Sequence, residues 1–508
     1  MHAAPDPAGS PTLPGVLPPF EIVRRLRPVA LVARERTTGF VAPYAAVEAE
    51  LDTHDVAGRL VAGFRGPAGL RLEGWYDGGR RLAGIDVTDA PGRTSHHRSR
   101  RHGRPDTPPE ALATTLTGRQ VTVLTRNDGS WTARAKVDLT DRVSTSDPEL
   151  LAGLEGDVAW LPREPAGRSP VSSWRAGTFG QLGLRDVALV TESDGTAVER
   201  DGRLHLTATH AGPGFFGTAH TGVWAFDPEA LEVVHLADLY VRRGGLVLGD
   251  HAAHLVRDGE RWLLASSTWG DFDRSGMGVS LATSTEDLLR GEHVLDAEPL
   301  DLPTTALPGR VVGTWDPHLA KIDGHWHLAF VAARKFFDFY PALARAAEPG
   351  RLDAWTLLGA APDRSGTEGT QLRRLDGTWR VLASDGADNP RGLRGRFPVF
   401  DLAMTEVGTL DAPYPSNIPW PTLVERDGVW TMLTFDGTPY GGEVGAGAER
   451  PAGPREHRHR GAVVGLEGPE RVAQGGRGRA VHRIAHLRSQ QGDRGDRAVE
   501  ADLDRHRS

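Results

Sequence analysis

The sequence predicts an all-β protein whose main part is a five-bladed β-propeller, preceded by a small N-terminal β-domain and followed by a disordered tail. Apolar and polar residues alternate with the period of strands through most of the 508 residues. Within residues 186–445, five Asp-Gly pairs, which favour the tight turns of hairpins, each lie between two apolar runs. After residue 440 the chain contains no Phe, Trp or Tyr and cannot build a core.

Before the propeller, the sequence indicates a leader, a small domain and a linker. Residues 1–20 are rich in Pro and have no basic segment ahead of an apolar run, so they indicate a disordered leader rather than a secretion signal. Residues 21–142 alternate in the manner of strands and predict a sandwich-like β-domain, with short helical pieces fitting residues 44–51 and 148–154. Residues 143–185 are rich in Pro, Gly, Ser and Arg without periodicity, which predicts a linker.

A repeat occupies residues 186–445. Its Asp-Gly turns are spaced 57, 65, 53 and 51 residues apart, and each is followed by further strand-like segments. A period of this length, with enough residues for about four strands per unit, is typical of a propeller whose blades surround a central channel. Residues 446–508 are expected to be a disordered or non-native tail. The turns lie at Asp201, Asp258, Asp323, Asp376 and Asp427.

The composition narrows the class of partner. The formal net charge is -8 and the pI is near 6.2, so the chain lacks the surplus of Lys and Arg that nucleic acids or anionic membranes require. It has no Cys, which excludes disulfides and thiolate chemistry, and no apolar stretch long enough to span a membrane. We therefore expect a cytoplasmic protein that acts on a small molecule or a neutral polymer, without a nucleic-acid or membrane partner.

Three carboxylates fall near one register of the repeat. Counting seven residues back from the turns gives Asp194 and Asp316 in two units, with Glu368 one residue further back in a third. Because blades are related by rotation, such positions on the inner strands face the same channel. Like charges in one pocket push pKa values apart, so that one carboxyl stays protonated while another is ionised. Cleavage of a glycosidic bond needs this division of labour.

The series of Asp194, Asp316-Pro317 and Glu368-Gly369 on successive hairpins resembles glycoside hydrolase family 43, and more broadly the five-bladed furanosidase superfamily that also contains families 32 and 68. The resemblance covers residues 186–442. It implies that Asp194 is the general base, that Asp316 tunes the pKa of the acid and orients it, and that Glu368 is the general acid. The Glu-Gly pair favours family 43, whose members invert the anomeric configuration.

Further residues near this register are candidates for substrate binding. Aromatic rings stack on the C–H faces of sugars, and polar side chains in the channel could contact hydroxyl groups. Structural roles are the alternative: Asp194 could cap a turn, His318 could be a core histidine, and Arg394 could lie on the surface. The aromatic candidates are Trp269, Trp315, Phe336 and Trp420, and the polar candidates are Asp250, His251, His318 and Arg394.

The predicted function is hydrolysis of terminal arabinosyl or xylosyl glycosidic bonds by an inverting acid–base mechanism. It requires no cofactor and no catalytic metal, although the propeller channel could hold a structural ion. Two alternatives stay open. One is a non-catalytic propeller that binds a glycan or a protein through the same channel, and the other is a retaining fructosidase of the family 32 or 68 type.

Overall fold

The computed structural model describes residues 17–52, 57–163, 168–214, 216–272, 276–437 and 461–467. In these ranges the chain consists of strands with one short α-helix, α1 (Pro148–Ala152), and a few single 3-10 turns, which confirms the all-β prediction. No helix in the described ranges has the length and apolar character needed to cross a membrane. The predicted leader up to residue 16, and the predicted tail apart from residues 461–467, lie outside the described residues.

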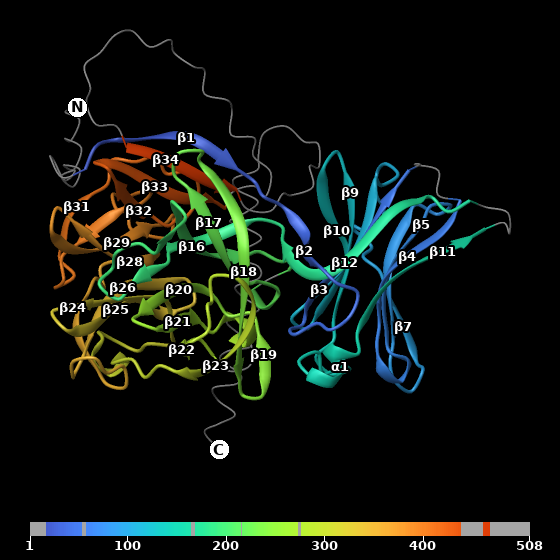
Figure 1. Ribbon diagram of the computed structural model, residues 1–508, viewed down its shortest axis with the longest axis horizontal. Helices are drawn as coiled ribbons and strands as arrows, with labels where there is room; N and C mark the ends of the chain where they lie inside the picture. Colours follow the sequence, from blue (N-terminus) through green and yellow to red (C-terminus); the bar gives the residue numbers. More distant parts are fainter. Residues whose placement is uncertain are drawn as a thin grey trace, which may run out of the picture. The chain divides into compact units, whose positions relative to one another are not determined.

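Two antiparallel sheets form an N-terminal β-sandwich, which confirms the predicted small β-domain (Figure 1). Their facing sides bury apolar residues such as Leu60, Leu72, Leu112 and Val121 in one core. One sheet, ordered β10-β9-β8-β3-β12-β2, contains β2 (Ala30–Glu35), β3 (Tyr44–Leu51), β8 (Ala111–Thr117), β9 (Gln120–Asn127), β10 (Ser130–Asp138) and β12 (Val171–Gln181). The other, ordered β11-β4-β5-β6-β7, contains β4 (Gly58–Arg65), β5 (Arg71–Asp77), β6 (Leu82–Thr88), β7 (Thr94–His97) and β11 (Glu155–Pro162).

The sandwich extends further along the chain than the sequence predicts. Residues 143–185 are not a linker, because β11 and β12 within them belong to the two sheets. β11 is a partly exposed edge strand, and the second half of β12 is buried throughout, so neither shows the alternation of a half-buried strand. Residues 44–51, where a helical piece is expected, form β3 inside a sheet, whereas the helix expected near residue 148 is α1.

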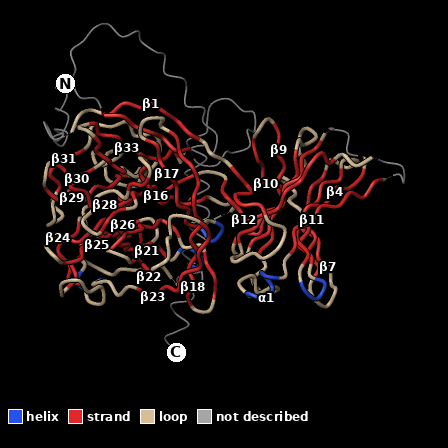
Figure 2. Tube along the Cα trace, in the orientation of Figure 1, coloured by secondary structure: helices blue, strands red, loops and turns tan. Residues whose placement is uncertain are grey.

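Most of the remaining strands, drawn in red in Figure 2, form five four-stranded blades, as predicted. Blade I contains β13 (Leu184–Leu189), β16 (Arg203–His210), β17 (His220–Asp227) and β18 (Glu232–Arg243). Blade II contains β20 (His251–Asp258), β21 (Arg261–Ser267), β22 (Val279–Ser284) and β23 (Gly291–Pro299). Blade III contains β24 (Gly313–Ile322), β25 (His325–Lys335), β26 (Asp338–Ala346) and β27 (Trp355–Ala360). Blade IV contains β28 (Thr367–Leu375), β29 (Thr378–Asp385), β30 (Pro398–Phe400) and β31 (Glu406–Thr409). Blade V contains β32 (Thr422–Arg426), β33 (Val429–Asp436), β34 (Gly461–Glu467) and β1 (Phe20–Leu26).

Blade V is completed by strands from distant parts of the sequence (Figure 1). β34 pairs in parallel with β33, and β1 pairs in parallel with the other edge of β34. β1 therefore belongs to the propeller, although the predicted boundaries divide it between the leader and the sandwich domain. Its partner strand is near the other end of the described chain, so no local pattern reveals the pairing. Blades I and II share one sheet, because β18 pairs in parallel with β23.

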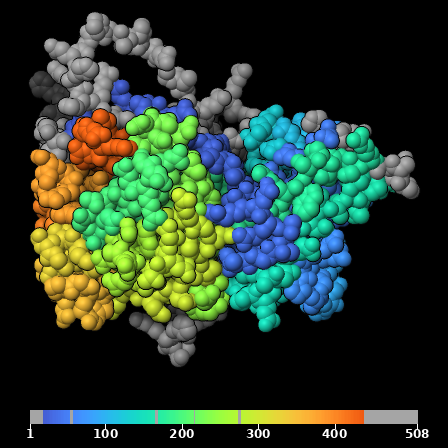
Figure 3. Space-filling model, viewed as in Figure 1, coloured from blue at the N-terminus to red at the C-terminus, as the bar shows by residue number. Residues whose placement is uncertain are grey.

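The sandwich packs on blades I and II (Figure 3), and both belong to one compact unit, Met1–Glu470. Tyr44 of β3 stacks on Tyr240 of β18 with ring centroids 5.2 Å apart, and both side chains are buried. Arg34 of β2 donates from Nε to the buried carboxylate of Asp238 in β18 at 3.3 Å. The junction is therefore a packed interface rather than a flexible connection.

Candidate active site

The inner strands of blades I to IV break their pairing at the same place. In β13, β20, β24 and β28 the pairing with the second strand is interrupted, and a residue at each break has a positive φ. Left-handed backbone is strained for residues other than Gly, and such strain gathers at functional sites. Because the break recurs, the residues around it lie at one level of the propeller axis. These residues are Asp186 (φ 50°), Ala252 (φ 52°), Asp316 (φ 52°) and Gly369 (φ 72°).

Asp316 is buried at this level and held by neighbouring blades. Its carboxylate accepts the backbone N–H of Gly369 at 3.0 Å. Its own N–H donates to the hydroxyl of Ser267 at 2.9 Å, and its carbonyl oxygen accepts the hydroxyl of Thr370 at 2.7 Å. Only 3% of Asp316 is exposed. The carboxylate is thus fixed beside Glu368, the residue that precedes Gly369.

Three carboxyl groups interact electrostatically here. Burial raises the pKa of Asp316 well above its usual value, and the nearby charges of Glu368 and then Asp186 raise it further. Glu368 in β28 and Asp186 in β13 are both half-buried. Blades I, III and IV therefore bring one carboxyl group each to a single cluster, which we call the carboxyl cluster. Asp316 and Glu368 come together as predicted, but the third member differs from the prediction.

Thr209 of β16 links Asp186 to blade II. Burial raises the pKa of Asp186, and a hydrogen bond from the Thr209 hydroxyl opposes this rise. The same oxygen accepts the N–H of Ala252 at 3.1 Å. Ser267, on the second strand of blade II, corresponds to Thr209 of blade I. Its hydroxyl accepts the N–H of Asp316 in blade III. A hydroxyl group on the second strand of one blade thus supports the break in the next blade.

Asp194, the predicted base, does not join the carboxyl cluster. It is exposed, and its carboxylate accepts hydrogen bonds from the N–H and the hydroxyl of Thr196 at 3.0 and 2.7 Å. These bonds cap a local turn, which is the structural alternative stated for Asp194. The adjacent Ser193 carbonyl accepts the N–H of Lys321 at 2.6 Å. Since Lys321 stands five residues along β24 from Asp316, the turn lies roughly 16 Å from the cluster.

An insertion explains why counting seven residues back from the Asp-Gly turn does not reach the carboxyl cluster in blade I. Fifteen residues separate Asp186 from the turn at Asp201, whereas seven separate Asp316 from the turn at Asp323. The extra residues form β14 (Thr191–Glu192), β15 (Glu199–Arg200) and the turn between them. Counting back from the turn of blade I therefore stops inside the insertion.

A different spacing marks the break directly. A buried Leu follows it by three residues in each blade, one residue after the inner strand resumes regular pairing. This spacing is kept in blade I, where the spacing to the turn is not. The pairs are Asp186 and Leu189, Ala252 and Leu255, Asp316 and Leu319, Gly369 and Leu372, and, in blade V, Trp420 and Leu423.

Aromatic side chains gather around the breaks of blades II and III. Trp269 stacks on Phe216 with ring centroids 4.1 Å apart and lies 5.5 Å from Trp315. Phe336 lies 6.3 Å from Trp269, edge to face, and 6.3 Å from Phe272. The three aromatic residues predicted in this region are thus in one group. Phe216 and Phe272 escaped prediction because they lie in connections that do not follow the repeat.

Trp420 packs on the break of blade IV. A Cβ atom on Gly369 would lie 2.3 Å from the indole ring, so only Gly fits at this left-handed position. The indole nitrogens of Trp420 and Trp315 are buried, and neither meets a hydrogen-bond acceptor within the described part of the chain.

Asp250 and His251 are engaged in other contacts. The Asp250 carboxylate accepts two hydrogen bonds from the Arg243 guanidinium, at 2.6 and 3.0 Å, and the N–H of Gly270 at 2.9 Å. His251 donates from Nδ1 to the carbonyl of Gly249 at 2.9 Å, and burial lowers its pKa to about 4. Its ring lies 6.4 Å from Trp269, so His251 borders the aromatic group, whereas Asp250 faces Arg243.

His318 is a core histidine. Its ring stacks on that of His254 with centroids 3.6 Å apart. The Nδ1 atoms of the two rings accept backbone N–H groups of the next blade, from Leu372 to His318 at 3.3 Å and from Leu319 to His254 at 3.0 Å. Burial lowers the pKa of both, to about 3 for His254 and well below the usual value for His318, so both are neutral.

Arg394 lies on the surface. Its Nε donates to the carbonyl of Asn389 at 2.6 Å. The buried amide of Asn389 in turn donates to the carbonyl of Gly366 at 2.8 Å. Arg394 therefore supports the segment that leads into β28 and Glu368.

Two groups of side chains bear on the binding of a metal ion. The two stacked histidines of the channel use Nδ1 as an acceptor for backbone N–H groups, which removes those lone pairs from an ion. In blade I, His210, His235 and Asp238 have possible ligand atoms within 4.8 Å of one another. The Trp224 indole donates to Nε2 of His210 at 2.8 Å, so a neutral His210 carries its proton on Nδ1, the atom that faces Asp238. This group is arranged to hydrogen-bond a carboxylate rather than to hold an ion.

Comparisons with known proteins give limited likeness. No family model matches the chain, and no curated protein matches it in sequence. Similar solved structures include a family 117 glycoside hydrolase from Zobellia galactanivorans, with 12% identity, a TM-score of 0.35, and 48% of this chain and 74% of that chain covered. A levansucrase variant from Bacillus subtilis has 10% identity and a TM-score of 0.37, over 48% and 77% of the chains. A GH43_1 enzyme from Xanthomonas citri has 14% identity and a TM-score of 0.34, over 49% and 80%. Sequence identities and TM-scores this low do not assign an activity to this chain.

Proposed function

We propose that this chain is a glycoside hydrolase in which Asp186 is the general base, Glu368 is the general acid, and Asp316 positions the acid. One observation carries the proposal: the inner strands of three blades bring these carboxyl groups into electrostatic contact around a buried aspartate. The predicted roles of Asp316 and Glu368 are kept, and the role of base moves from Asp194 to Asp186.

Asp186 is suited to activate water. It is half-buried and stands at the break of blade I, in the cluster with Asp316 and Glu368. The hydrogen bond from Thr209 stabilises the ionised form against the effect of burial, and a base must be ionised to accept a proton. In the proposed reaction Asp186 takes a proton from water while the water oxygen bonds to the anomeric carbon.

Glu368 is suited to protonate the leaving group. Asp316 and Glu368 repel each other when both are ionised, so the pair favours holding one proton between them. Asp316 is buried and bound to the N–H of Gly369, whereas Glu368 is the more exposed member. Glu368 is therefore the group that can deliver the proton to the glycosidic oxygen as the bond from that oxygen to the anomeric carbon breaks.

The proposed substrates are terminal arabinosyl or xylosyl residues, cleaved with inversion. The support is the residues around the carboxyl cluster: Trp315 precedes Asp316 and lies 5.5 Å from Trp269, and aromatic rings can stack on the C–H faces of a neutral sugar. The Glu368-Gly369 pair, which resembles family 43, supports inversion.

A leaving-group comparison tests the proposal. Wild type is assayed on nitrophenyl arabinofuranoside, xyloside and fructoside and on arabinobiose and xylobiose, and NMR identifies the anomer formed first. Glu368→Gln should lose activity on the disaccharides by a factor on the order of 10³, and less on nitrophenyl substrates, because nitrophenolate leaves without protonation. Undiminished hydrolysis of a disaccharide by this variant would refute the assignment.

The other outcomes identify the alternatives. Sugar binding by wild type without any turnover would establish a non-catalytic propeller. Hydrolysis of fructosides with retention of configuration would establish a fructosidase.

A further inference from the structure

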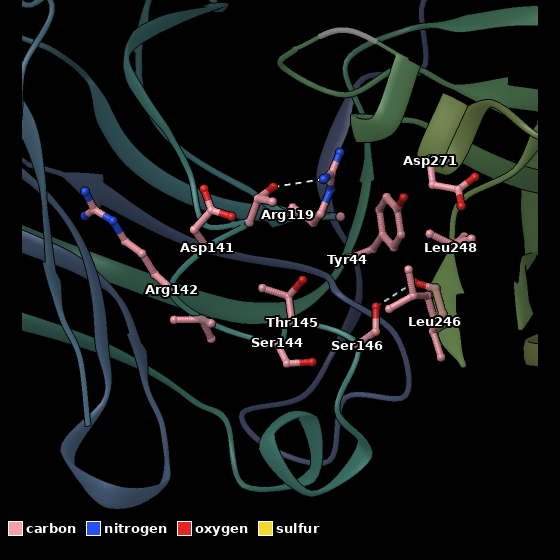
Figure 4. A pocket seen from close by; sticks show the side chains of 15 residues that line it. Tyr44, Arg119, Asp141, Arg142, Ser144, Thr145, Ser146, Leu246, Leu248 and Asp271 are labelled. Atoms are coloured by element: carbon pink, nitrogen blue, oxygen red, sulfur yellow. Dashed lines mark hydrogen bonds between the residues drawn. The ribbon is translucent and has the colours of Figure 1, made fainter. Parts of the chain in front are cut away.

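A cavity of about 350 Å³ lies where the sandwich meets blades I and II (Figure 4). The sandwich contributes Tyr44, the turn at residues 118–119 and the loop of residues 140–146. The propeller contributes β19 (Leu246–Leu248) and residues 270–271. A volume in this range is typical of sites for small ligands.

One side of the cavity is polar. Arg119, labelled in Figure 4, donates to the hydroxyl of Thr140 at 2.9 Å, and both residues line the cavity. The Tyr44 hydroxyl donates to the carbonyl of Gly217 at 3.3 Å. Asp271 lies on the propeller side, where the Arg243 guanidinium donates to its carboxylate. Hydroxyl, guanidinium and carboxylate groups therefore border one space.

The other side is apolar. Leu246 and Leu248 of β19 line the cavity, and Val143 does so from the sandwich loop. Ser144 stands in the same loop and is exposed. A lining with an apolar strip beside mixed donors and acceptors matches a sugar ring, which has C–H groups on its faces and hydroxyl groups around its edge.

The charges of the lining oppose an anionic ligand. The Arg142 guanidinium is turned away and donates to the hydroxyl of Ser95 at 2.6 Å. Asp271 shares the Arg243 guanidinium with Asp250, so these three side chains together have no positive excess. Arg119 and the exposed Asp141 add one charge of each sign to the lining. The cavity thus lacks the excess of positive charge that would concentrate a phosphate or carboxylate ligand.

We propose that this cavity is a second, non-catalytic binding site for a neutral sugar residue, such as the end or a branch of a polysaccharide. The site is placed next to the candidate active site. Gly270 and Asp271 follow Trp269 in one 3-10 turn (Trp269–Asp271), and Trp269 belongs to the aromatic group beside the carboxyl cluster. A sugar bound in the cavity would hold its polysaccharide close to that cluster.

The test is native electrophoresis in gels that contain soluble arabinan or arabinoxylan. The choice of these polysaccharides rests on the proposed function, whereas the cavity itself does not. Full-length wild type should be retarded, and Ser144→Trp, which fills the cavity from an exposed loop, should migrate as in a gel without polysaccharide. Ser172→Trp is the matched control, because Ser172 is exposed on β12 and does not line the cavity. Arg119→Met removes the guanidinium without filling the space and should weaken the retardation.

Activity on nitrophenyl substrates separates this inference from the proposed function. Ser144→Trp should keep kcat/KM within about twofold of wild type, because it leaves the carboxyl cluster intact. If wild type shows no hydrolytic activity but is retarded in the gel, and Ser144→Trp is not retarded, the sugar site is supported and the proposed hydrolase is refuted. Three results would overturn the sugar site. Wild type could show no retardation, or Ser144→Trp could be retarded as strongly as wild type. The third is retardation that glycine or phosphate relieves and that arabinose or xylose does not.

Discussion

The backbone N–H of Gly369 donates to the carboxylate of Asp316 at 3.0 Å, across the boundary between blades III and IV. This contact ties the position of Glu368, which precedes Gly369, to a buried carboxyl group whose pKa is raised well above its usual value by burial and by its neighbours. A group of this kind costs folding stability while it serves the chemistry. Activity and stability should therefore change in opposite directions when it is neutralised.

Asp316→Asn should lower kcat and raise the stability of the protein at neutral pH. The Asn oxygen still accepts the N–H of Gly369, but the charge is lost. The pKa of Asp316 in the folded protein lies above its value near 4 in the unfolded chain, so the folded protein binds the carboxyl proton more tightly. The contribution of Asp316 to the free energy of unfolding therefore falls as the pH rises above about 4. The gain in Tm should thus be larger at pH 7 than at pH 5, as measured by calorimetry. A variant less stable than wild type at both pH values would contradict this account.

Asp186→Asn should strongly lower the rate of hydrolysis, whereas Asp194→Asn should leave it close to that of wild type. Loss of a general base lowers kcat by a factor on the order of 10² to 10⁴, on activated and unactivated substrates alike, because water attack is impaired in both. Asp194→Asn is the matched control: it changes the same chemical group in the same blade but only affects an exposed turn. Steady-state kinetics on both substrate classes decide the assignment. Equal loss in the two variants would argue against the placement of the base at Asp186.

Thr209→Val should move the acid limb of the kcat/KM profile to higher pH. The Thr209 hydroxyl lowers the pKa of Asp186, so its removal raises that pKa and leaves less of the ionised base at a given pH. The variant also leaves the N–H of Ala252 without an acceptor, which should cost about 1–3 kcal/mol of stability. Thr209→Ser keeps the hydroxyl and should retain a profile close to that of wild type. An unshifted profile in the Val variant would show that Asp186 does not control this limb.

His254→Asn should make stability less sensitive to acid. The folded pKa of His254 is lowered to about 3, below the unfolded value near 6.5. Between these values the unfolded chain binds a proton that the native chain does not, so stability falls as pH falls from 6.5 towards 3, by on the order of 4 kcal/mol for this residue. Asn does not titrate, and its side-chain oxygen can accept the N–H of Leu319.

The matching measurement is urea unfolding of both proteins at pH 7, 5 and 4. The loss of the stack on His318 should make the Asn variant less stable at pH 7. The difference from wild type should then shrink as the pH is lowered. A difference that stays constant with pH would disprove the linkage.

The blade architecture was predictable because each blade repeats one hairpin, and its turn and apolar runs are local in the sequence. Asp316 and Glu368 were predictable for the same reason, since their blades keep the common spacing to the turn. Asp186 was not found because the insertion in blade I displaces the turn, while the break in the strand, which the turn does not control, stays in register. The register of an inner strand follows the residues that pack into the blade core.

Features set by contacts between distant segments were the ones missed. β11 and β12 looked like a linker because their burial depends on the partner sheet and on the propeller rather than on alternation. Asp250 stands near the register of the site, but its carboxylate is bound by Arg243, which nothing in the sequence marks as its partner. A carboxylate near the right register is therefore a candidate only until its counter-ion is known.

The pairing of β1 with β34 has a consequence for biosynthesis. The first strand of the described chain has its partner in residues 461–467, so it must wait unpaired while the sandwich and the first four blades are synthesised. Blade V cannot be completed before the ribosome has released residue 467, and until then the open edge of β33 is available to other chains. In pulse-labelled nascent chains, blade V should therefore stay sensitive to protease until residue 467 has emerged, and the sandwich should become resistant earlier.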